Sequence, residues 1–413
     1  MRYPLASLGE YVNFSNGKAS PNRDLGGPYF VFGSNGLIGQ AQEFNAPAGT
    51  TIIGRVGSFC GSLHYSKQPC WVTDNAIKAT SKSPLENTFW FYALTNRNLN
   101  DLSTGSGQPL INQTALKSVQ LPVPPFEDRV RIGAILSSFD DKIELNRRMN
   151  ETLEALTQAI FKDWFVDFGP VRRKQEGATD AFGILGGLIR NSARAAEVAA
   201  IFPNSFGDDR LPEGWDTYSL DELATLSKAS LSPSKTPDQV FEHHSLPAYD
   251  KGEEPVTETG SSIMSNKFLV PSDSVLLSKL NPEISRVWVP NPKVKHTQIA
   301  STEFLVLVPR QGFGRSLLCA IFRDPTFRAG LEGMVIGTSK SHQRISPTAL
   351  MAKEIVSGEL RAFIKFESLA AHLLEMRLSL RSEIRGLAET RDYLLPKLMS
   401  GEVRVHDAQK LAE

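Results

Sequence analysis

The sequence predicts an α+β protein with two strand-rich globular domains in tandem repeat, each followed by one long helix, and the two helices paired as an antiparallel coiled coil. Three observations predict this fold: an internal repeat, a seven-residue apolar period in two long segments, and short β-rich runs ahead of each segment. The chain has 413 residues, which is more than one compact core usually holds and favours several domains.

The internal repeat is visible in two short matches that keep their order along the chain. Residues 113–116 correspond to residues 347–350 at an offset of 234, and the same offset relates the two long periodic segments that follow them. Near the start of each half, residues 7–11 resemble residues 219–223 at an offset of 212. The matching order indicates duplication, with about 22 extra residues in the second copy.

The two long segments carry apolar residues at every seventh position. A seven-residue apolar seam needs a helix partner, because one side of the helix stays unburied otherwise. The alternative is that each helix only packs on its own domain, but helices of roughly 40 residues would be about 60 Å long, which favours pairing. The expected helix-pairing residues are Ile132, Phe139, Leu153 and Ile160 in the first segment and Phe366, Leu373, Leu380, Leu387 and Leu394 in the second.

Three polar residues, Lys142, Asn146 and Asp163, interrupt the first seam. Buried, such residues commonly fix the register or orientation of paired helices at a cost in stability. If the helix is rotated slightly, they lie in water instead, and both readings stay open.

The domain boundaries follow from the same patterns. The β-rich runs are punctuated by glycine, proline, serine and asparagine, and a connector that could contain a short helix separates the two halves. The expected segments are a first globular domain at 1–125, a long helix at 126–168, a connector at 169–212, a second globular domain at 213–358, and a second long helix at 359–402.

Composition and charge exclude several classes of protein. The 45 basic and 45 acidic side chains cancel, which argues against a stand-alone protein that grips nucleic acid by bulk charge. The sequence shows no run of 18 apolar residues, no secretory signal and no metal-ligand spacing among its three cysteines. We therefore expect a reduced, cytoplasmic protein without a metal site.

The motifs of common enzymes are missing. The sequence has no phosphate-binding loop of the type that hydrolyses nucleotides. The tetrapeptide Asp324–Phe327 is close to a catalytic motif of amino-methyltransferases but lacks its second proline. We expect a chain that is not catalytic by itself and holds no cofactor.

Glycine-punctuated loops offer candidate contacts to DNA. Glycine permits tight turns and close backbone approach, while Asn, Gln and Arg side chains can read base edges. Arg55 aligns with Lys279 at an offset of 224, so both halves have a cation after equivalent β-runs. The alternative is that these loops only cap the following helix. The candidate DNA-binding residues are Ser34, Asn35, Arg55 and Gln108 in the first half and Lys279, His342, Gln343 and Arg344 in the second.

The order of the motifs resembles that of a known family. The motifs are Tyr29–Gly36, Gly54–Ser58, Gly105–Ile111, the proline-rich Leu121–Pro125, the helix end Phe161–Phe168, and Leu211–Trp215. Together they resemble the specificity subunit of type I restriction-modification systems, usually called HsdS, over essentially the full chain. The second half departs from this pattern, because Ile355–Gly358 replaces the proline-rich lead-in and the glycine loops are poorer.

The resemblance implies two target-recognition domains, each of which reads one half of an interrupted sequence in double-stranded DNA. It implies that the paired helices set the spacing between the halves, and that two methyltransferase subunits and the restriction subunits join this non-catalytic subunit. The methyltransferase and endonuclease activities of the complex would require it, while S-adenosylmethionine, ATP and Mg²⁺ would belong to the partner subunits.

Three other functions stay open at this stage. The chain could be the recognition chain of a type IIB-like restriction-modification system, which uses the same domains with a different catalytic partner. It could also be a duplicated coiled-coil scaffold that binds only proteins, or an enzyme with an unrecognised site.

Overall fold

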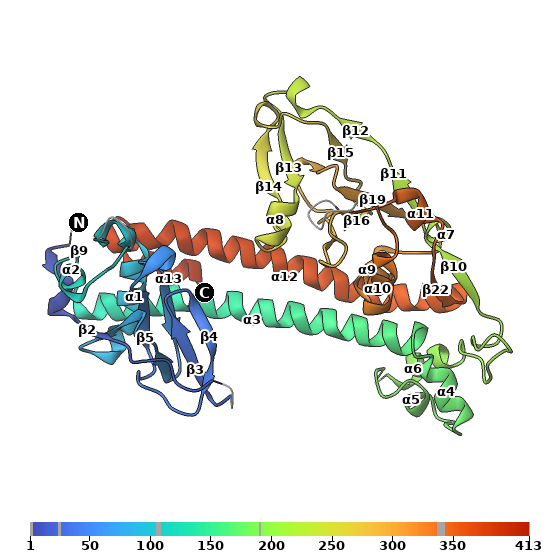
Figure 1. Cartoon of the computed structure of the whole chain (residues 1–413), viewed down its shortest axis with the longest axis horizontal. Coiled ribbons are helices and arrows are strands. Elements are labelled where there is room, and N and C mark those ends of the chain that lie inside the picture. The colour runs from blue at the N-terminus through green and yellow to red at the C-terminus, as the bar shows by residue number, and fades with distance from the viewer. Residues whose placement is uncertain (1–2, 24–25, 105–108, 190, 337–342, 413) are drawn as a thin grey trace. The chain divides into compact units, whose positions relative to one another are not determined.

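A computed structural model describes the fold of most of the chain. The described residues are 3–23, 26–104, 109–189, 191–336 and 343–412. The chain forms two compact units, of which unit 1 comprises Met1–Arg147 with Arg381–Glu413 and unit 2 comprises Arg148–Leu380. The long helices α3 (Phe126–Phe165) and α12 (Leu360–Ser400) contribute residues to both units (Figure 1). The prediction of an α+β fold with two long helices is confirmed.

The globular part of unit 1 contains a four-stranded antiparallel sheet, a three-stranded sheet and a two-stranded ribbon. The first has the order β2 (Val12–Asn16), β8 (Ala76–Ser81), β5 (Thr50–Gly54), β6 (Leu63–Ser66), and the second has the order β4 (Gly36–Ala41), β3 (Tyr29–Gly33), β7 (Cys70–Val72). The ribbon consists of β1 (Leu5–Ser7) and β9 (Gln120–Pro122). The shorter helices of unit 1 are α1 (Asn87–Thr95), α2 (Gln113–Lys117) and α13 (Val405–Ala412).

Unit 2 has the same kinds of sheets. Its four-stranded sheet has the order β11 (Ala224–Ser227), β19 (Phe304–Pro309), β16 (Val275–Ser278), β17 (Val287–Trp288). Its larger sheet has the order β12 (Ser230–Leu231), β15 (Lys267–Leu269), β18 (Thr297–Ala300), β13 (Val240–His244), β14 (Val256–Thr259). The two-stranded sheets are β10 (Asp216–Ser219) with β22 (Glu354–Gly358) and β20 (Val335–Ile336) with β21 (Arg344–Ile345). The helices are α4 (Gly169–Gln175), α5 (Ala181–Ile184), α6 (Ser192–Ala199), α7 (Leu220–Leu223), α8 (Leu246–Asp250), α9 (Arg315–Arg323), α10 (Pro325–Glu332) and α11 (Pro347–Met351).

The two units contain two copies of one fold. The order β2-β8-β5-β6 recurs as β11-β19-β16-β17, with every pair antiparallel in both. The three strands β4-β3-β7 recur as β14-β13-β18, again with one antiparallel and one parallel pair. Even the capping box that joins Ser7 to Glu10 recurs between Ser219 and Glu222, at the offset of 212 that relates the two sequences. The long helices begin 234 residues apart, at Phe126 and Leu360.

Within each unit, α3 and α12 pack against each other in antiparallel fashion. In unit 2 the ring centroids of Phe161 and Phe366 lie 5.9 Å apart, and those of Phe165 and Phe363 lie 5.0 Å apart. Residue numbers therefore fall along α12 as they rise along α3. In unit 1 the same direction follows from the ion pairs Asp140–Arg391 and Lys142–Glu383.

The expected pairing residues are buried to different degrees. Ile132, Phe139, Ile160, Phe366 and Leu394 are buried, whereas Leu153, Leu373, Leu380 and Leu387 are half-buried. In α12 the neighbouring Leu374 and Leu378 are buried instead. An α-helix has 3.6 residues per turn, so a position that recurs every seven residues rotates gradually around the helix and away from the buried side. Along α3 one series of buried positions follows steps of four and three, at Ile132, Leu136, Phe139, Ile143, Asn146 and Asn150.

The three polar interruptions have different environments. Asn146 is 1% exposed, so the expectation that it could lie in water is wrong. Asn150, one turn further, donates its side-chain amide to the backbone oxygen of Arg377 at 3.3 Å. The side chain of Lys142 is 48% exposed, and Asp163 accepts two hydrogen bonds from Arg173 at 2.9 and 2.7 Å.

A buried carboxylate in unit 1 and a half-buried carboxylate in unit 2 connect each globular part to its long helix. In unit 1 the side chain of Glu86 accepts a hydrogen bond from Arg129 Nε at 2.7 Å and another from Trp90 Nε1 at 3.0 Å. In unit 2 the carboxylate of Glu367 on α12 accepts from the backbone amides of Ser316 and Leu317 at the start of α9. Charge-assisted hydrogen bonds of this kind are roughly twice as strong as neutral ones.

We predict that Glu86→Ala strongly destabilises the protein. The substitution leaves the guanidinium of Arg129 buried without its counter-charge, which typically costs 3–5 kcal/mol, so about that loss is expected in the free energy of unfolding in urea. Asp141→Ala is the matched control, because it breaks the exposed ion pair of Asp141 with Lys67 and should cost less than about 1 kcal/mol. Equal effects of the two substitutions would contradict this account of the Glu86–Arg129 pair.

We also predict that Asn146→Leu stabilises the protein. The Nδ2 atom of Asn146 is buried and has no hydrogen-bond partner among the described residues, so removing it should raise the free energy of unfolding by about 1–3 kcal/mol. Glu151→Leu, at an exposed position of the same helix, should change it by less than about 0.5 kcal/mol. A loss of stability in Asn146→Leu would show that the amide contributes more than it costs.

Candidate nucleic-acid interface

The loops that follow β5 and β16 are equivalent in their backbone hydrogen bonds. The amide of Arg55 donates to the oxygen of Asn75 at 2.9 Å, and the oxygen of Arg55 accepts from the amide of Ile111 at 3.0 Å. Lys279 makes the same two bonds with the equivalent residues of unit 2, which are Glu303 at 3.0 Å and Ile345 at 2.9 Å. The two cations aligned from the sequence therefore occupy the same position in two copies of one domain.

The turn after each cation has the same left-handed backbone. Gly57 has a φ of 73°, and Asn281, at the equivalent position of unit 2, has a φ of 51°. Asparagine is one of the few non-glycine residues that adopt this region readily, which explains how the second loop keeps its shape with fewer glycines.

In unit 1 two of the predicted glycine loops lie against each other. A Cβ on Gly54 would come within 2.2 Å of the oxygen of Phe59 and 2.8 Å of the oxygen of Ser34, so this position has no room for a side chain. The turn of Ser34 and Asn35 between β3 and β4 thus lies beside the loop of Arg55. Asn35 is exposed, Ser34 and Arg55 are half-buried, and the Nη1 atom of Arg55 donates to the oxygen of Asp74 at 3.4 Å.

In unit 2 the cations gather around one carboxylate. Arg344 in β21 donates Nε and Nη2 to the two carboxylate oxygens of Glu303, each at 3.0 Å. These hydrogen bonds, together with the charges of Lys279 and Arg344, hold the pKa of the Glu303 carboxyl below its usual value, so it is charged at neutral pH. Gln343 is half-buried and its backbone oxygen accepts from the amide of Asn281 at 3.0 Å. The candidates Gln108 and His342 lie outside the described residues.

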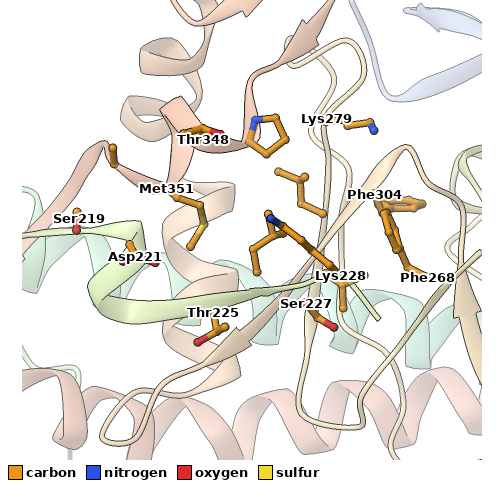
Figure 2. A pocket seen from close by; sticks show the side chains of 15 residues that line it. Ser219, Asp221, Thr225, Ser227, Lys228, Phe268, Lys279, Phe304, Thr348 and Met351 are labelled. Carbon is orange, nitrogen blue, oxygen red and sulfur yellow. The ribbon is translucent and has the colours of Figure 1, made fainter. Parts of the chain in front are cut away.

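Lys279 also lines a pocket of about 920 Å³ in unit 2 (Figure 2). Its wall includes a second lysine, Lys228, together with Phe268, Thr348 and Met351, so two cations border a largely apolar recess. Figure 2 shows the side chain of Lys228 extending across the pocket.

The corresponding place in unit 1 is bridged by side chains. There the amides of Gln113 and Asn16 lie 3.0 Å apart, joining the start of α2 to the end of β2. The equivalent residues of unit 2 are Pro347 and Lys228, which cannot form such a bridge. The two copies thus share a backbone but differ in the side chains at this site.

Two residues of this candidate interface, Glu303 and Lys228, were not predicted from the sequence. Both could have been found by carrying the repeat through the β-rich domains, since they occupy the positions of Asn75 and Asn16. The described residues contain no group of three or more His, Cys, Asp or Glu side chains that could hold a metal, and none of their helices is long and apolar enough to cross a membrane. Cys60, Cys70 and Cys319 are free and buried.

Comparisons with known proteins show similarity to DNA specificity subunits. Residues 5–155 match the family model of the type I restriction modification DNA specificity domain. The chain is 24% identical to the type I restriction enzyme HindI specificity subunit of Haemophilus influenzae over 71% of each chain. It is also 24% identical to the MjaIX specificity subunit of Methanocaldococcus jannaschii, over 87% of this chain and 79% of that one.

The fold has a counterpart among solved structures. The S subunit of a type I restriction-modification system from M. genitalium matches 97% of this chain and 96% of its own, with a TM-score of 0.61 and 14% identity. At that identity the likeness concerns the fold, and it extends over both duplicated halves. The family model and the curated relatives show that the sequence of the chain is similar to those of type I restriction-modification specificity subunits.

Proposed function

We propose that the chain reads a bipartite target in double-stranded DNA, with each strand-rich domain reading one part. The observation that carries this proposal is the duplicated loop after β5 and β16, which has one backbone and different side chains in the two copies. The same backbone then presents two DNA-reading loops. Because their side chains differ, the two parts of the target can have different base sequences.

The zero net charge supports a subunit rather than a stand-alone DNA-binding protein. Phosphate contacts dominate the affinity for DNA and need an excess of cations, which this chain does not have. Methyltransferase subunits, and restriction subunits that join them, would supply the missing contacts and all of the chemistry. S-adenosylmethionine, ATP and Mg²⁺ would be bound by those partners, and this chain would direct their methylation and cleavage without catalysing either.

The long helices support a further part of the proposal, which is that they set the gap between the two parts of the target. Both run through residues of both units without a break. A continuous helix is a stiff connector whose length is fixed by its number of residues.

We predict that Arg55→Ala relaxes recognition of one part of the target and leaves the other part unchanged. A bidentate contact to a base is worth roughly 1–3 kcal/mol of discrimination. Binding of the assembled methyltransferase complex should be measured on DNAs mutated separately in each part. Arg97→Ala is the matched control, since that guanidinium already donates to the oxygen of Gln120 at 3.1 Å in unit 1.

Two other results would change the assignment of Arg55. An equal loss on all DNAs, with a smaller salt dependence, would make it a phosphate contact. An unchanged affinity on every DNA would remove it from the interface. Failure of the wild-type complex to discriminate any sequence would favour a scaffold that binds only proteins.

We predict that removing one heptad from the middle of each long helix shortens the gap and leaves both flanking sequences the same. Seven residues at 1.5 Å each span about 10 Å, or roughly three base pairs of DNA at 3.4 Å. Whole heptads keep the apolar seam in register. Methylome sequencing of cells that carry the variant gives the answer, with the exposed substitution Glu151→Lys as control. Altered flanking sequences with an unchanged gap would contradict this role of the helices.

A further inference from the structure

The ion pair of Glu303 with Arg344 uses only one edge of the guanidinium. The carboxylate accepts from Nε and Nη2, which form the side edge of the group. An arginine has five N–H donors, so the ion pair does not use the end edge formed by Nη1 and the second hydrogen of Nη2. No described residue accepts a hydrogen bond from Nη1 of Arg344.

The side chain of Arg344 is more exposed than that of the arginine in a structural ion pair of the same unit. Arg286 makes the same side-edge pair with Asp250, at 2.7 and 2.9 Å, but its side chain is only 9% exposed. The side chain of Arg344 is 43% exposed and that of Glu303 is 25% exposed. A ligand can therefore reach the end edge of Arg344 while Glu303 holds the other edge.

Arg344 also lies in the candidate interface. Its backbone forms a β-bridge with Leu280, the residue after Lys279, just as Leu110 does with Val56 in unit 1. At the two positions where unit 2 has Glu303 and Arg344, unit 1 has Asn75 and Leu110, which cannot form an ion pair. The pair is thus an addition of the second copy to a loop that both copies share.

We propose that Arg344 reads a guanine in the part of the target bound by unit 2, and that Glu303 is the positioning residue that holds its guanidinium for this contact. The inference rests on the proposed DNA-reading function. Two parallel N–H groups match the O6 and N7 acceptors of guanine in the major groove, which is the commonest specific contact of arginine with DNA. Other base pairs do not offer this pair of acceptors in the major groove.

Glu303 contributes to specificity in two physical ways. It restricts the rotamers of a long side chain before binding, so less conformational entropy is lost when the base contact forms. It also neutralises the guanidinium locally, which weakens the attraction of Arg344 to phosphates on any sequence. Removing the carboxylate should therefore lower the affinity for the correct sequence relative to others, while the affinity for unrelated DNA rises.

The test compares Glu303→Gln with the wild type in the assembled methyltransferase complex. Equilibrium binding is measured on the cognate DNA, on DNAs with each base pair of the target substituted, and on unrelated DNA over a range of salt. We expect discrimination at a single G·C pair to fall roughly 5- to 150-fold, the fold-change that corresponds to about 1–3 kcal/mol. Affinity for unrelated DNA should rise and its salt dependence should become steeper.

Two further variants separate positioning from folding. Asp250→Asn breaks the matched pair with Arg286 and should leave discrimination at that G·C pair unchanged. Arg344→Lys keeps the charge but loses the two parallel donors, so it should relax the same base pair as Glu303→Gln. Thermal unfolding of each complex shows whether a variant is folded.

Specific outcomes would overturn the inference. Relaxation of different base pairs by the Glu303 and Arg344 variants would do so, as would an equal change in affinity on every DNA. Relaxation of the same base pair by Asp250→Asn would show that the effect is one of stability. Absence of any sequence preference in the wild-type complex would instead be a failure of the proposed function.

Discussion

The structure depends on the burial of an apolar seam that neither long helix can cover alone. Each helix has about 40 residues, and within each unit part of its apolar seam is buried against the other helix and the globular part. Because burial of apolar area is the main favourable contribution to folding, the globular domains and the helices stabilise one another. The carboxylates of Glu86 and Glu367 make this packing more specific, because each accepts hydrogen bonds from particular donors and so favours one position of the helix against the globular part.

Duplication separates the part of the protein that must stay constant from the part that can change. The order and direction of the strands and the left-handed turn after the cation recur in both copies, because they determine how the chain folds. The side chains at the ends of these strands contribute less to the core, so they can differ between the two copies. Asn75 and Leu110 in one copy therefore correspond to Glu303 and Arg344 in the other without a change of backbone.

The sequence was most informative where one physical pattern extends over many residues. A seven-residue period continued over some 40 positions predicts a long helix well, and the repeat predicts that Arg55 and Lys279 are equivalent. The sequence was less informative where contacts join distant residues. Burial of Asn146 depends on the rotation of a helix, and the ion pair of Glu303 with Arg344 joins two residues that are 41 positions apart in the chain. Leu153, Leu373 and Leu380 fit the period but are only half-buried, because the period does not include the drift of a real helix.

We propose above all that two copies of one domain read two different parts of a single DNA target. This proposal can be tested by methylome sequencing of cells that express this chain with its methyltransferase partner, compared with cells that lack only this chain. We expect one methylated motif that has two specified parts of different sequence, separated by a gap of fixed length, and that disappears without the chain. A continuous motif, or methylation that does not depend on the chain, would contradict it.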